Sequence, residues 1–364
     1  MTVYADIDLD AVRHNIAKVS EVAQTPICAV VKADGYGHGA LPVAAAAVEA
    51  GATWLAVATV SEAVAVSATN PLIPVLVLSE RPAVELNEFA GRLPDNIRLT
   101  VATERGVRAC TRLGARVRLH LKIDTGMHRM GADPAEAVEI ARLIESLPQV
   151  ELEGVWTHLA QADNGVAEPS DAQLVRFEEV LGRLTEAGIS PPMRHVANSA
   201  GTLAHPASRH DLVRIGIAMY GVAPSEHFEG VIGLRPALRL STSVSAVRDV
   251  RAGESVSYGG RWSATVAQRV ATLPVGYADA VRRDSGLHGV EVLIGSRRRR
   301  IVGNVTMDQT MVLVDEHVLT GDEAVLIGDQ GQEAIGANDV ARHLGTIGYE
   351  VLTSIGPRVV RRYG

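Results

Sequence analysis

The sequence predicts an α/β fold in which a (β/α)8 barrel of the TIM type is followed by a β-rich C-terminal domain. Strand and helix signals alternate eight times between residues 27 and 215, and such alternation indicates a parallel sheet that eight units can close into a barrel. From residue 237 onward, apolar and polar residues alternate with the period of half-buried antiparallel strands. For the first part, a doubly wound open sheet is the competing architecture, because periodicity does not separate the two.

The texture of the sequence changes near Gly233-Leu234-Arg235-Pro236, and we place the domain boundary there. Residues 1–235 are predicted to form the barrel, with the first few residues able to pack with the C-terminal domain. Residues 236–364 are predicted to form the C-terminal β domain. No low-complexity linker separates the two parts, which favours close packing between them.

Each element follows from a local pattern. Asp10 is predicted to cap the first helix, because apolar residues recur at helical spacing after it. The barrel strands are expected at Ile27–Val31, Trp54–Ala58, Val75–Leu78, Ile97–Val101, Val117–Ile123, Leu152–Thr157, His195–Ala197 and Leu212–Ile215. The helices are expected near 40–50, 61–69, 82–91, 103–113, 134–146, 170–187 and 201–205. The later strands are expected at Ala237–Val250, Val266–Leu273, Val290–Ile294, Arg300–Val305, Met311–Val314 and Ala324–Ile327, with one helix near 337–344.

Composition limits the classes of function. A net charge of −7 and a pI of about 6.0 favour neither a nucleic-acid partner nor an anionic membrane surface. The dense basic run Arg297–Arg300 is expected to be a solvated strand or turn. Cys28 and Cys110 form no disulfide framework, which fits a reducing, cytoplasmic setting. We see no signal peptide and no membrane span. The histidines lack ligand spacing, so no metal site is expected.

The stretch from Ala29 to Gly39 carries the most chemical information. A buried strand is predicted to end at Lys32, and Gly35, Gly37 and Gly39 follow, so the backbone must turn sharply or approach another segment closely. Charged side chains are rarely buried without a partner. A desolvated lysine has a lowered pKa and becomes a candidate for a Schiff base. A lone lysine more commonly bends back to solvent.

Polar residues end several of the predicted strands, and in a barrel those ends meet at one rim. The strand-end residues are Lys32, Lys122, Asp124, His158, Asn198, Ser199 and Arg214. Singly, each has an ordinary explanation. Lys122 and Asp124 can form a local ion pair, and His158 can be a satisfied core histidine. Asn198 can start a turn or cap a helix. Their convergence at one rim is the arrangement that a barrel enzyme needs.

A phosphate group suits the same rim. Late-strand loops of barrels supply backbone donors for phosphates. Ser199, Tyr36 and the amides of Gly216 and Ile217 are the donors that we expect there.

The chain resembles the alanine racemases of the pyridoxal-phosphate, barrel-fold class essentially from end to end. The motifs that carry this resemblance are Ala29–Gly39, Lys122–Gly131, Thr157-His158, Asn198-Ser199-Ala200, Arg214–Gly221, Val256-Ser257-Tyr258-Gly259, Val275-Gly276-Tyr277-Ala278-Asp279, Thr306-Met307-Asp308-Gln309, Gly348-Tyr349-Glu350 and Pro357-Arg358. The resemblance implies an isomerase that uses pyridoxal 5′-phosphate to interconvert L-alanine and D-alanine, which supplies peptidoglycan precursor.

The resemblance also implies roles for individual residues. Lys32 would hold the cofactor and serve as one base, and Tyr258 would be the second base. Tyr258 would come from the partner subunit, so the active enzyme would be a homodimer. The implied cofactor contacts are Tyr36, Ser199, Arg214 on the pyridine nitrogen, Gly216, Ile217 and Tyr349. The implied substrate-side residues are Arg129, Met307, Asp308 and Tyr277, with Tyr277 lining the entry. Lys122 would be carbamylated, as N6-carboxylysine, and would orient Arg129.

Racemisation removes the α-proton from one face and returns a proton on the other, so two bases on opposite faces perform it directly. A tyrosine with a free pKa of ~10 is a poor base at neutral pH. His158, backed by Arg214, would lower the pKa of Tyr258.

One position departs from the family pattern, and alternatives remain open. Thr306 stands where many members carry cysteine, which leaves the substrate range open between alanine, serine and a broader set. A decarboxylase of basic amino acids would pair the pyridine nitrogen with a carboxylate, whereas Arg214 is expected there. A non-catalytic cofactor-binding barrel protein would lack the β domain that carries Tyr258.

Overall fold

Eight parallel strands form the barrel sheet, in the order β8-β7-β6-β5-β4-β3-β2-β9. The structure, a computed structural model, describes residues 2–114 and 116–364. The strands are β2 (Ile27–Val30), β3 (Trp54–Val57), β4 (Val75–Val77), β5 (Ile97–Val101), β6 (Val117–Lys122), β7 (Val150–Trp156), β8 (Met193–His195) and β9 (Val213–Ile215). Because β2 pairs in parallel with both β3 and β9, the sheet curls into a nearly closed barrel. The predicted (β/α)8 fold is confirmed, and the doubly wound alternative is wrong.

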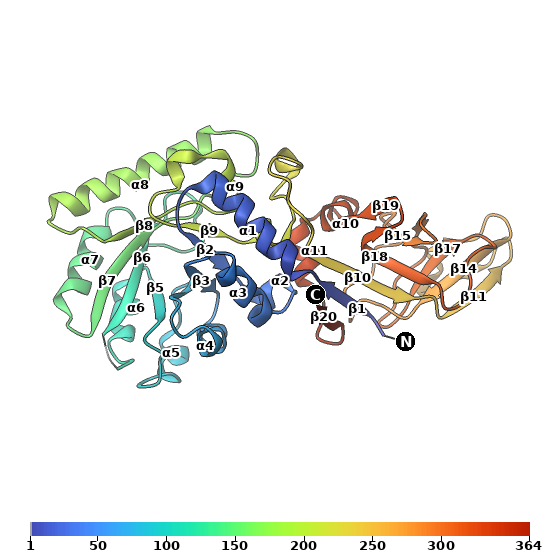
Figure 1. Ribbon diagram of the computed structural model, residues 1–364, viewed down its shortest axis with the longest axis horizontal. Coiled ribbons are helices and arrows are strands. Elements are labelled where there is room, and N and C mark those ends of the chain that lie inside the picture. Colours follow the sequence, from blue (N-terminus) through green and yellow to red (C-terminus); the bar gives the residue numbers. More distant parts are fainter. Residues whose placement is uncertain (1, 115) are drawn as a thin grey trace.

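Helices cover the outside of the barrel (Figure 1). They are α1 (Leu9–Ala23), α2 (Lys32–Tyr36), α3 (Ala40–Glu49), α4 (Val60–Thr69), α5 (Ala83–Asn87), α6 (Glu104–Cys110), α7 (Ala137–Ser146), α8 (Glu168–Glu186) and α9 (Ser199–Ala204), with the 3₁₀ turns η1 (Pro206–Ser208), η2 (Ile217–Tyr220) and η3 (Glu226–Phe228). Since the strands are buried on both faces, they read as continuous apolar runs in the sequence.

The cap of α1 differs from the prediction. Asp8, with extended backbone, is the N-cap, and its Oδ1 accepts from the Ala11 amide at 2.8 Å. The predicted cap, Asp10, lies inside the first turn and pairs with Arg13 at the surface. The prediction missed the true start because Leu9, one residue before Asp10, already belongs to the helix.

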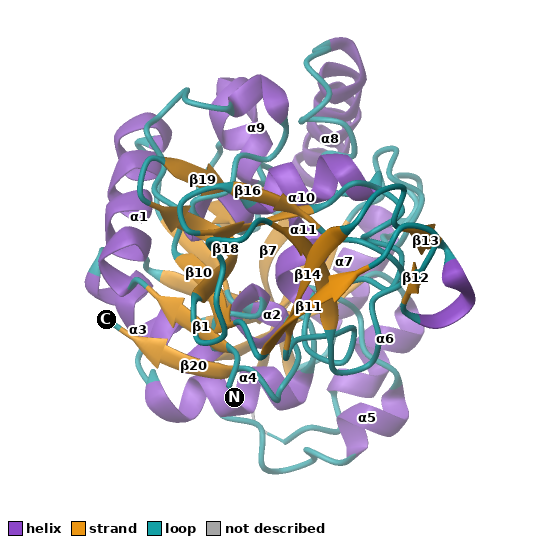
Figure 2. Cartoon of the chain, turned by 90° about the vertical axis from the view of Figure 1, so that its right-hand side faces the viewer, coloured by secondary structure: helices purple, strands orange, loops and turns teal. Residues whose placement is uncertain are grey.

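The second domain is built mainly from antiparallel strands (Figure 2). Its elements are β10 (Leu238–Ser243), β11 (Ala246–Val250), β12 (Ser255–Val256), η4 (Tyr258–Gly260), β13 (Trp262–Ser263), β14 (Gln268–Leu273), β15 (Glu291–Ile294), β16 (Arg298–Arg300), β17 (Thr310–Val314), β18 (Glu323–Gln330), β19 (Glu333–Ile335), α10 (Ala337–Leu344), α11 (Gly348–Thr353) and β20 (Val360–Tyr363). The β-rich C-terminal domain is therefore confirmed.

Two predicted strands of this domain are corrected. The expected strand Ala237–Val250 is two strands, β10 and β11, which belong to different sheets. The chain changes sheet at Val244 and Ser245, whose amides bond to different neighbouring segments. The expected strand Arg300–Val305 is shifted: the strand is β16 (Arg298–Arg300), Ile301 adds only an isolated bridge to Val312, and Gly303 turns the backbone with a φ of 68°.

The two ends of the chain join the domains. β1 (Tyr4–Ile7) lies in the large sheet of the second domain, antiparallel to β10 and parallel to β20. The chain then leaves that sheet directly into α1 of the barrel. Among the described residues, no helix is both long enough and apolar enough to cross a membrane.

The position of the α1 cap gives a stability prediction. Asp8→Ala should lower the free energy of unfolding by about 1 kcal/mol, because the Ala11 amide loses its acceptor. Asp10→Ala, the matched control, should cost less than about 0.5 kcal/mol, since it removes only a surface ion pair. Urea unfolding of both variants measures this difference. A larger loss for Asp10→Ala would show that the cap is misplaced.

Candidate active site

Lys32 lies two residues after the end of β2 and begins the short helix α2, which has an unusual backbone. The four residues after it, Ala33, Asp34, Gly35 and Tyr36, all have positive φ, between 51° and 61°. A left-handed backbone costs roughly 1–2 kcal/mol for each residue that carries a side chain. Such strain persists where surrounding contacts enforce it, and it gathers at functional sites.

The contacts that enforce this turn come largely from the end of the chain. A Cβ on Gly37 would lie 2.3 Å from the Leu352 carbonyl oxygen of α11, and one on Gly39 would lie 2.1 Å from the Tyr363 hydroxyl of β20. The Arg361 guanidinium also donates to the Gly37 carbonyl at 2.8 Å. The predicted close approach of the backbone is confirmed, and the segment that approaches belongs to the second domain.

The Lys32 amine is partly desolvated. Burial lowers the pKa of Lys32, the Arg129 guanidinium lowers it further, and the Glu62 carboxylate partly opposes them. Glu62 has a structural task as well, because it accepts from the Ala33 and Ala58 amides at 2.8 Å each. A larger neutral fraction of the amine than in a surface lysine follows, and the neutral amine is the form that attacks a carbonyl.

Arg214 is buried near this rim, and its guanidinium has no carboxylate partner among the described residues. It donates to Nδ1 of His195 at 2.9 Å, to Nδ1 of His158 at 3.1 Å, and to the carbonyl oxygens of Thr157 and Val196. Burial lowers the pKa of Arg214 to about 10, so the group is still a cation at neutral pH. A buried cation held only by neutral acceptors can exert its charge on a ligand.

His158 is kept neutral by this arrangement. Burial, followed by the charges of Arg214, Lys122, Arg129 and Lys32, holds the pKa of His158 well below its usual range. Because Arg214 can only donate, Nδ1 of His158 must be the acceptor and Nε2 carries the hydrogen. His158 is thus a donor to whatever lies beyond Nε2.

Lys122 lies beside the same cations. Its Nζ is 4.7 Å from the centre of the Trp156 ring, and the Arg214 guanidinium carbon is 4.6 Å from the same ring. Burial, then Arg129, Arg214 and Lys32, lower the pKa of Lys122 to about 7, against the opposing effect of Asp124.

The alternative of a Lys122–Asp124 ion pair does not form. No such pair occurs among the described residues. One carboxylate oxygen of Asp124 accepts instead from the amides of Gly126, Met127 and His128, at 3.0–3.1 Å.

Four cations therefore meet at the rim: Lys32, Lys122, Arg129 and Arg214. Lys122 and Arg214 lie against the same Trp156 ring, and the Arg129 charge lowers the pKa of both Lys32 and Lys122. Asp124 and Glu62 are the carboxylates that oppose them, and both are engaged by backbone amides. Such an excess of positive charge calls for anionic ligands.

The expected phosphate donors also lie together. A Cβ on Gly216 would lie 2.6 Å from the Tyr36 hydroxyl, and the Ser199 hydroxyl accepts from the Gly216 amide at 3.1 Å. The rings of Tyr36 and Tyr349 are 6.1 Å apart. Burial raises the pKa of both tyrosines, so both phenols stay protonated as donors. Among the described residues, neither hydroxyl has a hydrogen-bond partner, which fits an oxyanion ligand.

Of the predicted residues of the second domain, Tyr349 lies at this rim beside Tyr36, whereas three others are exposed. Tyr258, Tyr277 and Met307 are 73%, 45% and 52% exposed. They form one surface, which we call the tyrosine patch, because the Tyr277 amide bonds to the Thr306 carbonyl and the Asn304 side chain bonds to the Tyr258 carbonyl. The Asp308 carboxylate is engaged by Arg358 at 2.9 Å.

The fold and the rim define a barrel whose strand ends bring together a desolvated lysine amine and a set of donors that fits a phosphate. Comparison with known proteins makes the class specific. The family model for the alanine racemase N-terminal domain matches residues 7–224, and the model for the C-terminal domain matches residues 237–363. The chain belongs to the alanine racemase family, whose members depend on pyridoxal phosphate.

Individual relatives and solved structures support the same family assignment. An alanine racemase of Symbiobacterium thermophilum is 44% identical over 99% of this chain and 97% of its own length. An alanine racemase of Frankia casuarinae is 41% identical over 99% of this chain and 95% of its own length. The crystal structure of alanine racemase from Bacillus anthracis with bound L-Ala-P superposes with a TM-score of 0.92 at 38% identity, covering 100% of this chain and 95% of that one.

Two residues near the site were missed by sequence reasoning. Trp156 was seen only as part of a strand, yet its buried ring lies against Lys122, Arg214 and His195. Glu62 was seen only as part of a helix, yet it fixes the turn after Lys32. A usable signal for Glu62 was the capping box that it forms with Thr59, a pattern readable from the sequence.

The pKa values can be measured cleanly, because the chain has only three lysines, Lys18, Lys32 and Lys122. NMR of the apoprotein labelled with ¹³C at the lysine Cε should give three titration curves. In buffer free of CO2, which leaves Lys122 as the free amine, Lys122 should lose its proton near a pH of about 7 and Lys32 below its ordinary range. Three coincident curves would contradict the site electrostatics.

Proposed function

We propose that the protein interconverts L-alanine and D-alanine with pyridoxal 5′-phosphate held by Lys32, and that the product D-alanine serves peptidoglycan synthesis. Family membership supports the reaction. The observation that carries the assignment within this fold is Arg214, a buried cation whose partners are two histidine nitrogens and two carbonyl oxygens. The free thiols Cys28 and Cys110 support a cytoplasmic location.

The residues at the rim fit this cofactor. We assign its phosphate to Tyr36, Ser199, Tyr349 and the amides of Gly216 and Ile217, whose hydroxyls and N–H groups gather at one place. Arg214 is the partner that we assign to its pyridine nitrogen. When bound, the cofactor withdraws electrons from the substrate and makes its α-proton acidic.

The chain supplies one base and orients a second. Lys32, once free of the cofactor, takes or returns a proton at Nζ, and its lowered pKa favours the neutral form that accepts one. We assign the second proton transfer to the hydroxyl oxygen of Tyr258. The Nε2–H of His158, directed by Arg214, is the donor that would stabilise the ionised phenol.

The positions of these groups support a homodimer. Tyr258, Tyr277 and Met307 are exposed on the second domain, so the barrel rim of the same chain does not cover them. Exposed aromatic and thioether side chains in one patch are typical of an interface. We therefore propose that the tyrosine patch of one subunit completes the active site of the other, with Tyr277 and Met307 lining the substrate entry.

We also propose that Lys122 is carbamylated. A neutral amine bonds to the carbon of CO2 and releases one proton, and a pKa of about 7 leaves much of Lys122 neutral. The resulting carbamate is an anion among Arg129, Arg214 and Lys32. Its oxygens can accept charge-assisted hydrogen bonds and so orient Arg129 toward the substrate carboxylate.

The rival functions are less well supported. A decarboxylase of this fold would pair the pyridine nitrogen with a carboxylate, and Arg214 has none among the described residues. A non-catalytic barrel protein would lack the second domain, whereas the C-terminal family model matches residues 237–363. A broader racemase remains the second candidate, because Thr306 lies in the tyrosine patch beside the proposed entry.

Incubation with single amino acids in deuterated water tests the function. L-alanine and D-alanine should each give both enantiomers with deuterium at Cα, and serine should react more slowly. Lys32→Ala should lower the rate by at least about a thousandfold, because it removes both anchor and base. Release of CO2 would identify a decarboxylase, and absence of exchange would identify a non-catalytic protein.

Mixed dimers test the shared site. Lys32→Ala and Tyr258→Phe chains, each inactive alone, should recover roughly a quarter of wild-type activity after subunit exchange, because one site of each mixed dimer is intact. Lys32→Ala mixed with Arg214→Ala is the control and should recover nothing, since both positions lie on the barrel. Equal behaviour of the two mixtures, with exchange verified by mass spectrometry, would refute a site built from two chains.

A further inference from the structure

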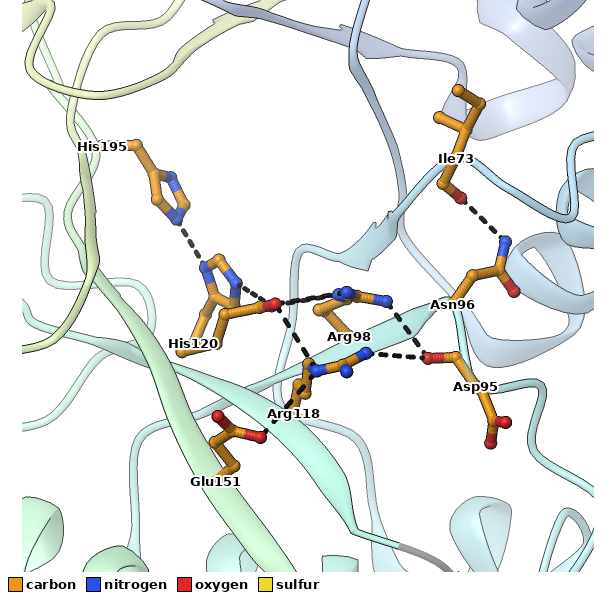
Figure 3. A network of polar contacts seen from close by, with 9 residues as sticks. Ile73, Asp95, Asn96, Arg98, Arg118, His120, Glu151 and His195 are labelled. Carbon is orange, nitrogen blue, oxygen red and sulfur yellow. Dashed lines mark hydrogen bonds and ion pairs between the residues drawn. The ribbon is translucent and has the colours of Figure 1, made fainter.

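A line of hydrogen bonds runs from Arg214 through His195 and His120 into the interior of the barrel. Figure 3 shows its inner part, from His195 through His120 toward Arg98. Arg214 donates to Nδ1 of His195 at 2.9 Å. Nε2 of His195 is 2.8 Å from Nδ1 of His120, and Nε2 of His120 is 3.1 Å from the Glu153 carboxylate. Arg98 closes the line with a salt bridge to Glu153 at 3.0 Å.

The chemistry of the partners fixes every hydrogen in this line. An arginine can only donate, so Nδ1 of His195 accepts and Nε2 carries the hydrogen. That Nε2–H donates to Nδ1 of His120, which leaves the His120 hydrogen on Nε2. A carboxylate can only accept, so the His120 Nε2–H donates to Glu153. The same positions of the ring hydrogens follow whether one starts from Arg214 or from Glu153.

The surroundings keep both rings neutral. Burial, then Arg214, His120 and His210, hold the pKa of His195 well below its usual range, and the Trp156 ring stacks on it. Burial lowers the pKa of His120 and, with a smaller contribution from the Arg98 and Arg214 charges, outweighs the opposing effect of Glu153. The Trp54 ring packs edge-on against His120.

Glu153 stays ionised at the far end of the line. Burial raises the pKa of Glu153, but hydrogen bonds from His120 and Arg98 outweigh it, and the pKa lies below its ordinary value. Arg118 also lies within 3.8 Å of this carboxylate.

The pairing register of the strands brings the residues of this line within hydrogen-bond distance. Four members come from β5, β6, β7 and β8, which are consecutive in the sheet, and Arg214 comes from β9, where its amide donates to the Ala197 carbonyl just after β8. Between β6 and β7 the pairing shifts, so that His120 pairs with Gly154 and Glu153 is the extra residue. Such a bulge re-aims a side chain. A Cβ on Gly154 would lie 2.6 Å from Nδ1 of His120, so only glycine leaves room for the ring.

We propose that His120 and Glu153 are positioning residues for racemisation, which fix the tautomer of His195 so that Arg214 always faces an acceptor. The reversed tautomer would present a hydrogen of His195 to a hydrogen of Arg214. Arg214 would then lose a buried bond and its fixed place beside His158. This inference rests on the proposed function, because the role of Arg214 in catalysis comes from it.

Two substitutions of His120 distinguish its effect on the tautomer of His195 from the effect of the space that its ring fills. In His120→Asn, the side-chain oxygen lies near the former Nδ1 and can still accept from His195. In His120→Gln, the longer amide reaches toward Glu153 and leaves His195 without that acceptor. The glutamine variant should lose kcat by about tenfold or more with little change in KM, and its pH profile should shift. The asparagine variant should keep kcat within about twofold.

Thermal unfolding serves as the control, because both variants remove the ring and should lose similar stability. Equal kcat values and pH profiles in the two variants, whether both are reduced or both unchanged, would overturn the proposal.

Neutron diffraction from crystals of the wild-type holoenzyme tests the tautomers without any variant or activity. Deuterium should lie on Nε2 of His195 and on Nε2 of His120, with none on either Nδ1. Deuterium on Nδ1 of His195 would overturn the proposal. A wild-type enzyme that fails to racemise alanine would instead refute the proposed function and leave this measurement valid.

Discussion

The site depends on one constraint, which is the burial of the Arg214 guanidinium without a carboxylate partner. Burying a cation is costly unless its hydrogen bonds are satisfied. Here the acceptors are ring nitrogens of His158 and His195 and the carbonyl oxygens of Thr157 and Val196. The positive charge is therefore not cancelled locally, and it acts on Lys122, His158 and any ligand at the rim. Together with burial, this charge keeps His158 and His195 neutral, lowers the pKa of Lys122 and favours anionic ligands.

The second constraint is the division of the site between two domains. The second domain reaches the barrel of its own chain through α11 and β20, which fix the strained turn after Lys32. The tyrosine patch of the same domain stays exposed. The second domain thus has two tasks. It holds the strained turn after Lys32 in its own barrel, and in our proposal it supplies the second base to the partner subunit.

Much of this was readable from the sequence. Polar residues ended several of the predicted barrel strands, so Lys32, Lys122, His158 and Arg214 could be placed at one rim before the structure. The three glycines after Lys32 predicted a close approach of the backbone, and Leu352 and Tyr363 make it. The individual roles of these residues came from family resemblance and remain proposals.

The features that the sequence did not predict depend on strand register and side-chain packing. Asp8 rather than Asp10 caps α1 because the helix begins one residue before Asp10, and helix ends are poorly specified by apolar spacing. The line from Arg214 to Glu153 requires a bulge in β7, which local sequence patterns do not encode. Trp156 was hidden in an apolar strand, where a core residue and a platform for cations look the same.

The central claim is that Arg214 places an uncancelled positive charge at the cofactor. The most direct test compares Arg214→Glu with Arg214→Lys in the holoenzyme, measuring pyruvate formed from alanine per racemisation event. A carboxylate there favours a proton on the ring nitrogen and spreads negative charge into the cofactor, which promotes transamination. We predict a rise of at least about tenfold in this ratio for Arg214→Glu and little change for Arg214→Lys. An unchanged ratio in a folded, cofactor-loaded Arg214→Glu enzyme would contradict the account.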